Sequence, residues 1–560
     1  MRAIKYIQYT FQQTNFRFQP LILSVVFCLL ASAVLAQKDS TKKASIDITS
    51  SYKPVLRNAV KINFSATNLN ADTSKIPLLY NIPSQNLFYT YQPISLKPLA
   101  LDRDTILDLG NRNFVKIGYG NYSTPYLKAG LSFGNGKKLL ANIYGDYISS
   151  QGDIKNQNYS EANEKATISY FTPNNELYGA IGAYQHTYYL YGYDHTIYNY
   201  SASDVRQQFQ NYSAKIGFKN RDINNWGVNY NPNVQVSYFT NLNKLTEQTL
   251  VADVPFEKVL NDQFALKLAF NADVTSYSTL NFSPANIKFN NNIYQVAPEV
   301  VYTGSLFTLH VGLTPAWDNG ESNVLPNIYG ELPIKNKMFT VQAGFVGKYD
   351  KNTYQNLSVI NPYLTTFTAE QNTKEVELYG GVKANLDKHF IVSAKAGIVT
   401  FDNLPFFIND TATDNKAFLI SNERNVQDMR VHGEVSYISE EKLTLTAGFT
   451  TNQYAGFKDN KKAWGELPFE LNASLRWQAL KNLLFKSDLL AFTGAPYLSK
   501  GNVAKSSSGG ADLSAGAELS LAKHISLWVD INNILNDKYQ RWNNYEVYGI
   551  NVVGGLLVKF

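Results

Sequence analysis

Hydrophobic and polar residues alternate along the last sixteen residues of the chain, Tyr545–Phe560. Side chains of a β-strand point alternately to its two faces, so every second residue shares a face. Apart from the phenol of Tyr548, one face of this segment is wholly apolar; it comprises Tyr548, Ile550, Val552, Gly554, Leu556, Val558 and Phe560. The pattern predicts a terminal strand with one face toward lipid, as in the closing strand of a membrane barrel.

The same alternation recurs upstream, where polar faces carry charges of both signs. Residues 139–147, 376–384, 431–437, 513–519 and 525–531 each place an apolar face opposite a polar one. Such strands are expected between lipid and a wet lumen. The candidate lumen-lining residues are Glu375, Glu377, Lys383, Lys395, Glu434, Asp512, Glu518 and Asp530. Two interpretations stay open: charges that tune solute selectivity, and charges that only wet a wide interior.

Short and long connections separate these segments. The short ones predict hairpin turns at 135–137, 173–175, 222–224, 335–337, 386–388, 440–442, 479–481 and 522–524. The long, polar ones lie near 150–163, 191–204, 351–371, 402–424 and 496–507. Short turns on one rim and long loops on the other are typical of an outer-membrane barrel with extracellular long loops.

The fold class predicted for residues 111–560 is therefore all-β, a transmembrane antiparallel β-barrel. With membrane strands of about 9–11 residues, the pattern gives about 22 strands, and any even number from about 16 to 22 is compatible with it. The number depends most on residues 244–305, where an expected loop at Asn281–Asn292 obscures the flanking strands.

The amino terminus predicts export. Residues 1–36 combine basic residues with an apolar run, Leu21–Ala36, and a small-residue cleavage site before Gln37, as in a signal peptide. The apolar run is shorter than the roughly 20 residues that span a bilayer, which disfavours the alternative of an uncleaved anchor. The single cysteine, Cys28, lies in this segment, so the mature chain is expected to have no disulfide and no thiolate metal site.

Residues 37–110 differ from the barrel pattern. They contain five prolines and only short apolar runs. We expect a short periplasmic or lumenal segment with a few short strands, the alternative being a disordered linker.

Composition agrees with a membrane barrel. Aromatic residues make up 14% of the chain, with 38 Tyr and 32 Phe, whereas mean hydropathy is slightly negative at −0.25. Without the three basic residues of the signal, 48 basic residues face 45 acidic ones, a net charge of +3. This balance gives no support for nucleic-acid binding.

Catalytic patterns are weak. Gly130–Gly134 matches the nucleophile-elbow spacing, but Ser132 falls within an expected strand instead of a strand–turn–helix. The histidines His186, His195, His310, His389, His432 and His524 lack metal-ligand spacing. We therefore expect no enzyme, no catalytic residue, no metal site and no cofactor.

Tyrosines cluster around the expected external loop at 191–204. The candidate extracellular recognition residues are Tyr184, Tyr188, Tyr191 and Tyr193. Tyrosines on a loop can stack on sugars or dock a partner. Placement in an interfacial aromatic girdle explains the members nearest the strand equally well.

The carboxyl-terminal region resembles that of TonB-dependent receptors. The matching positions are Asn533, Asn536 and Tyr539, followed by a last strand that ends at Phe560. The resemblance implies a 22-strand barrel, and the use of Tyr and Asn resembles that of Bacteroidetes outer-membrane proteins. Only about 75 residues lie between the expected signal peptide and the barrel, so we expect the chain to depart from the family by lacking a standard plug domain. Ser45–Thr49 is the best candidate for an energy-coupling box.

The resemblance implies solute or nutrient transport across the outer membrane of a Gram-negative bacterium. The alternative is a non-transporting scaffold or a subunit of an assembly or secretion complex. The expected partners are outer-membrane lipid and a lipoprotein or other envelope subunit, and coupling to TonB stays undecided.

Overall fold

The computed structural model describes residues 113–134, 136–279, 286–334, 338–365, 371–386, 389–439, 442–499 and 503–560. The expected signal peptide (1–36), the segment 37–110 and the candidate coupling box Ser45–Thr49 lie outside the described residues. Within them, no helix is long and apolar enough to cross a membrane.

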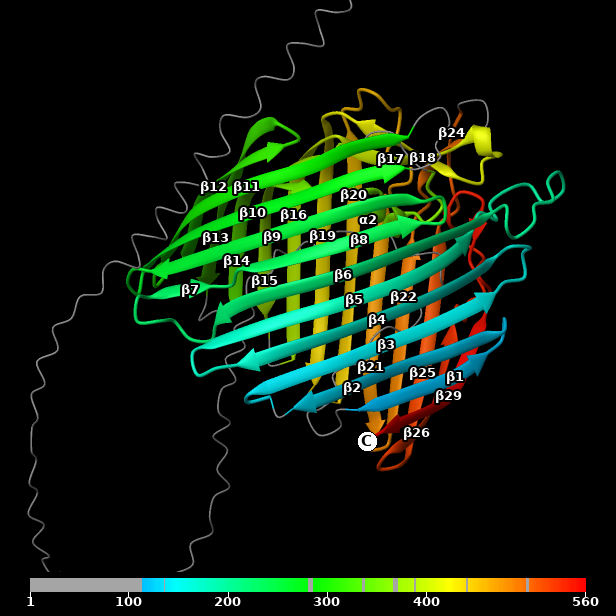
Figure 1. Cartoon of the computed structure of the whole chain (residues 1–560), viewed down its shortest axis with the longest axis horizontal. Helices are drawn as coiled ribbons and strands as arrows, with labels where there is room; N and C mark the ends of the chain where they lie inside the picture. Colours follow the sequence, from blue (N-terminus) through cyan, green and yellow to red (C-terminus); the bar gives the residue numbers. More distant parts are fainter. Residues whose placement is uncertain are drawn as a thin grey trace, which may run out of the picture. The chain divides into compact units, whose positions relative to one another are not determined.

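Most strands of the described chain form one closed antiparallel sheet (Figure 1). Its strands are β1 (Phe114–Gly120), β2 (Thr124–Gly134), β3 (Leu139–Gln151), β4 (Asn158–Phe171), β5 (Asn175–Tyr189), β6 (Arg206–Asn220), β7 (Val228–Tyr230), β8 (Asn233–Asn241), β9 (Leu245–Val259), β10 (Phe264–Thr279), β11 (Ile287–Thr303), β12 (Thr308–Asp318), β13 (Glu321–Ile334), β14 (Phe339–Asp350), β15 (Thr373–Asn385), β16 (Phe390–Asp402), β19 (Val426–Ser439), β20 (Leu443–Ala455), β21 (Phe469–Leu480), β22 (Leu483–Phe492), β25 (Gly510–Ala522), β26 (Ile525–Asn532) and β29 (Asn551–Lys559). Because β7 and β8 follow one another along β9, they form one spanning strand, and the barrel has 22. The predicted fold class is confirmed.

Pairing between the first and last strands closes the sheet. Strand β1 pairs with β29 from Phe114↔Lys559 to Gly120↔Val553. Full closure leaves no sheet edge, which a barrel in lipid requires.

The two faces of the wall follow the predicted alternation. Residues such as Ile117, Ile398 and Leu556 are 47%, 54% and 40% exposed on the outer face. On the opposite face of β29, Val553 and Leu557 are buried. The prediction that Tyr548 shares the lipid-facing side of the last strand is wrong. Tyr548 precedes β29 and is buried, and its ring packs against Tyr122.

The expected short turns at 173–175, 222–224, 479–481 and 522–524 join strands at the rim that holds both strand ends Phe114 and Lys559. The turn expected at 335–337 lies outside the described residues, and those at 135–137, 386–388 and 440–442 lie partly outside them. The opposite rim carries the larger additions: helix α2 (Tyr354–Ile360), the 3-10 turn η1 (Thr411–Thr413), and the hairpins β17 (Leu404–Asn409)–β18 (Phe418–Glu423), β23 (Pro496–Ser499)–β24 (Val503–Ser506) and β27 (Gln540–Trp542)–β28 (Tyr545–Glu546). Figure 1 shows β17, β18 and β24 at the rim away from the carboxyl end.

Two expected loops need correction. The loop expected at 150–163 is only 152–157, because β3 and β4 extend toward it, and β11 begins at Ile287 within the expected loop Asn281–Asn292. Residues 456–468 and 533–550 form long connections on the same rim as α2.

Candidate functional site

The described parts of the long connections fold over the barrel mouth and form what we call the loop cap: residues 190–205, 351–365, 371–372, 403–425, 456–468, 493–499, 503–509 and 533–550. Their buried side chains share one hydrophobic cluster with wall residues: Tyr191, Phe209, Phe239, Leu245, Tyr277, Tyr354, Leu357, Tyr363, Leu364, Phe407, Phe418, Leu467, Leu490, Phe492, Ala495, Tyr539, Trp542, Tyr545 and Val547. Phe239 comes from β8 and Leu490 from β22, on well separated parts of the wall. The cap therefore packs across the mouth.

Three tyrosines from different loops meet at the centre of this cluster. The Tyr363 and Tyr545 rings stack with centroids 3.6 Å apart, and Tyr191 meets Tyr545 edge-on at 4.8 Å. The Tyr191 hydroxyl donates to the Glu546 carbonyl at 2.8 Å. Burial raises the pKa of all three phenols, so they remain neutral donors inside the cap.

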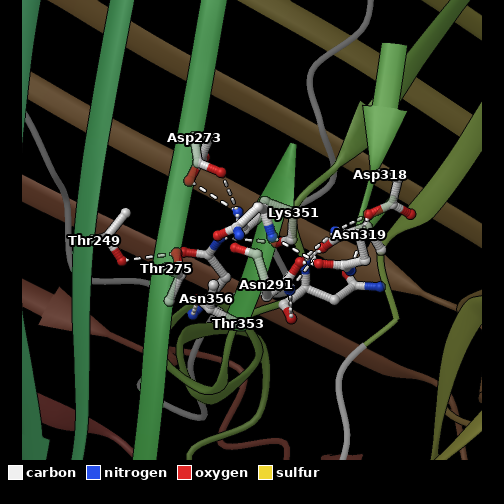
Figure 2. Close-up of polar contacts among 12 residues, drawn as sticks. Thr249, Asp273, Thr275, Asn291, Asp318, Asn319, Lys351, Thr353 and Asn356 are labelled. Carbon is white, nitrogen blue, oxygen red and sulfur yellow. Dashed lines mark hydrogen bonds and ion pairs between the residues drawn. The ribbon is translucent and has the colours of Figure 1, made fainter. Parts of the chain in front are cut away.

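A polar network anchors the loop that carries α2 (Figure 2). Lys351 Nζ donates to Asp273 Oδ1 at 3.0 Å and to the carbonyls of Asp273 and Asn291, each at 2.8 Å. Asn291 and Asn372 exchange side-chain amide hydrogen bonds of 2.9 and 2.5 Å, and Asn372 also donates to Asp318 Oδ1 at 2.6 Å. The loop starts after β14, yet it binds β10, β11 and β12.

The amino end of α2 rests on a wall carboxylate. Glu247, on β9, is 1% exposed and accepts from the backbone N–H groups of Tyr354 at 2.6 Å and Gln355 at 2.9 Å. The carboxylate satisfies donors that a helix amino terminus leaves free and faces the positive end of the helix dipole.

A second buried carboxylate joins two other loops. Glu423, at the end of β18, accepts from the backbone N–H groups of Lys458 and Asn460 at 2.6 Å each. Beside it, Arg424 donates to both oxygens of Asp459 at 2.8 and 2.7 Å. The hydrogen bond from this guanidinium lowers the pKa of Asp459.

The predicted recognition tyrosines belong to the cap or pack against it. Tyr191 and Tyr193 are each 5% exposed, and Tyr184 and Tyr188 pack against the cluster from β5. The Tyr188 hydroxyl donates to Glu161 at 2.6 Å, and Tyr184 accepts from Gln355 at 3.2 Å. A recognition role therefore stays a prediction, and it requires that the cap opens.

The predicted lumen charges divide into three groups on the inner face. On β15 and β16, Glu377 pairs with Lys395 at 2.9 Å, and Glu375 pairs with Lys348 at 3.2 Å and Arg430 at 3.6 Å. Lys383 and Glu434 follow on β15 and β19, nearer the rim that holds the chain ends.

The other two groups lie elsewhere on the wall. Asp512 is fully buried under the cap and accepts from Tyr539 at 3.0 Å. Near the seam, Glu518 pairs with Lys559 at 2.9 Å and Asp530 with Lys116 at 3.3 Å.

Sequence reasoning missed Lys348, Arg430 and Glu247. Arg430 lies on the inner face of β19 together with the predicted Glu434, and Lys348 lies on the inner face of β14. The alternation of polar and apolar residues could therefore have identified both. Glu247 lies in the region 244–305, whose strands were not resolved from sequence.

The carboxyl-terminal motif is a turn. Asn533 and Asn536 have φ of 49° and 52°, a left-handed conformation that Asn tolerates. Asn533 Nδ2 donates to the carbonyls of Asp537 at 2.9 Å and Tyr548 at 2.8 Å. Tyr539 inserts into the cap, and Phe560 is 57% exposed at the far rim.

The described residues contain no group of three or more His, Cys, Asp or Glu that could hold a metal ion. Ser132 donates to Asn142 at 2.7 Å within the wall. His310 pairs with Glu299 at 2.6 Å, whereas His389 and His524 contact backbone carbonyls at the rim.

No protein-family model matches the chain, and no curated protein matches it. Solved structures do. The FrpB iron transporter from Neisseria meningitidis (F3-3 variant) is similar with TM-score 0.62 and 12% identity, covering 82% of each chain. A mutant of the ferric enterobactin receptor PfeA from Pseudomonas aeruginosa gives 0.59 and 12%, covering 80% of each chain.

The siderophore receptor PirA from Acinetobacter baumannii gives a TM-score of 0.62 at 11% identity, again over 80% of each chain. At these identities the likeness is one of fold. It agrees with the 22-strand barrel that the carboxyl-terminal resemblance implied.

Proposed function

We propose that the chain is a transport barrel of a Gram-negative outer membrane, with an external mouth that its own loops close at rest. The observation that carries the proposal is the combination of a 22-strand barrel with a folded cap across one mouth. A barrel of this width needs an occupant or a cover to stop leakage. The cap supplies a cover that a solute would have to displace.

The solved neighbours suggest the solute class to test first. They are described as an iron transporter and as receptors for siderophores or ferric enterobactin. We propose an iron–siderophore complex or another nutrient of that size as solute. Residues 37–110, or an envelope lipoprotein, would close the lumen from the periplasmic side. Coupling to TonB would open this closure.

The decisive experiment measures uptake by cells of the native species with and without the chain. Loss of labelled ferric-siderophore or other nutrient uptake on deletion, restored by the full chain, supports transport. In planar bilayers, the full chain and a variant without residues 37–111 should both be silent, because the loop cap still covers the mouth; a steady conductance from the variant would show that the cap does not close it. Unchanged uptake across a solute panel would contradict the proposal.

A second function is favoured by the rigidity of the cap. Glu247 and Glu423 each hold a loop through two or more backbone N–H groups, which suits a permanent seal. A scaffold subunit of an envelope complex would need such a seal and no solute path. Stoichiometric co-purification of partners with intact uptake would select this function.

A further inference from the structure

Glu164 projects from the outer face of the barrel near the middle of β4. It lies four residues from Ile168 along the strand, so the two side chains share a face. Ile168 is 51% exposed on that face, and Glu164 is exposed as well. The carboxylate therefore lies among side chains that contact lipid.

Small residues surround this carboxylate. Gly145 on β3 and Ala183 on β5 are its direct neighbours across the sheet, and Ala162 and Ala166 flank it along β4. A Cβ at Gly145 would meet only the Asn163 carbonyl oxygen, at 3.7 Å. These five residues, Gly145, Ala162, Glu164, Ala166 and Ala183, form what we call the Glu164 patch. Because the other four are Gly or Ala, no large side chain of the patch covers the surface around the carboxylate.

A second carboxylate on the outer face has a cation partner, which Glu164 lacks. Asp402, at the end of β16, pairs with Lys374 at 2.6 Å. Among the described residues, none forms a hydrogen bond or ion pair with the carboxylate of Glu164. A carboxylate on the lipid face is unfavourable unless a cation pairs with it.

We propose that the Glu164 patch is the docking surface for a membrane-embedded partner protein that places a Lys or Arg side chain against Glu164. Small residues let the backbone of a partner approach closely, which brings its cation within reach of the carboxylate. A second copy of this chain packed about a twofold axis would place the two Glu164 side chains against each other. Acyl chains of lipid carry no cation.

The test places a photocrosslinking amino acid at Ala183 of the full chain, expressed in its own outer membrane. The matched control places it at Ala396, a small outward residue on β16. We expect an adduct with one discrete protein from Ala183 and none with that protein from Ala396. Glu164→Lys should lower the adduct about tenfold, because it sets like charges against each other.

Two further variants make the result specific. Glu164→Gln removes the charge with little change of shape and should lower the adduct in a barrel that still runs as folded in unheated gels. When the Lys or Arg of the partner that pairs with Glu164 is changed to Glu, the Glu164→Lys variant should form the adduct again. An adduct with lipid alone or with this chain itself, no adduct, or a protein adduct insensitive to these charges would overturn the proposal.

Discussion

At the scale of single residues, buried carboxylates hold the loop cap. Glu247, Glu423 and Asp512 are 1%, 0% and 0% exposed, and each accepts hydrogen bonds from cap residues. A buried charge is tolerated when such bonds satisfy it. Alternation predicted that Asp512 faces inward, but its partner Tyr539 comes from a distant loop. Sequence spacing carries no signal for such a contact.

Replacing Glu247 by Gln should loosen α2, because the amide offers one acceptor oxygen to two N–H groups. An unsatisfied buried donor costs about 1–3 kcal/mol. Hydrogen exchange at the amides of Tyr354–Ile360 should therefore speed up by about tenfold or more, since tenfold corresponds to roughly 1.4 kcal/mol. Glu257→Gln, further along the same strand, is the control. Equal exchange in both variants would show that Glu247 does not hold the helix.

At the scale of elements, the strands of the wall and the positions of most long loops were predictable, whereas the packing of the loops was not. Period-two patterns predicted strands such as β15, β25 and β26, because lipid and lumen impose opposite chemistry on the two faces. The break between β7 and β8 falls at Asn231-Pro232, where proline offers no N–H to the ladder. The cap loops obey no such period, since they pack against one another on several sides.

The anchor of the α2 loop can be tested with a single cysteine, because the only cysteine of the chain is Cys28. Ser358, in α2, is 4% exposed, so Ser358→Cys should react slowly with an impermeant maleimide. Lys351→Met removes the charged hydrogen bonds of the anchor, each worth about 1.5–3 kcal/mol. Labelling should then speed up by about tenfold or more. Lys461→Met, in an exposed part of another loop, should leave the slow rate unchanged, and a slow rate in both would refute the anchor.

At the scale of the whole molecule, closure depends on a seam between the two ends of the sheet. The terminal alternation predicted β29 as a closing strand, but its partner and register follow from inner-face packing. Gly118 and Gly555 pair across the seam, and the Trp528 ring lies against Gly118. Lys116 Nζ sits 3.8 Å from the centroid of that ring and pairs with Asp530. Sequence alone did not reveal this use of two glycines.

Gly555→Ala should weaken closure of the barrel. A Cβ at Gly555 would lie 1.9 Å from the Ile117 carbonyl oxygen and 2.6 Å from the Gly118 Cα, so the backbone of β1 must move. Overpacking of this kind costs about 1–3 kcal/mol or more. The thermal midpoint at which the compact band disappears from semi-native gels should fall. Gly380→Ala adds a methyl group to another strand, β15, where nothing lies within 4 Å, and should leave the midpoint unchanged. Equal midpoints would mean that β1 and β29 can separate at this pair without loss of stability, and that the rest of the wall holds the barrel closed.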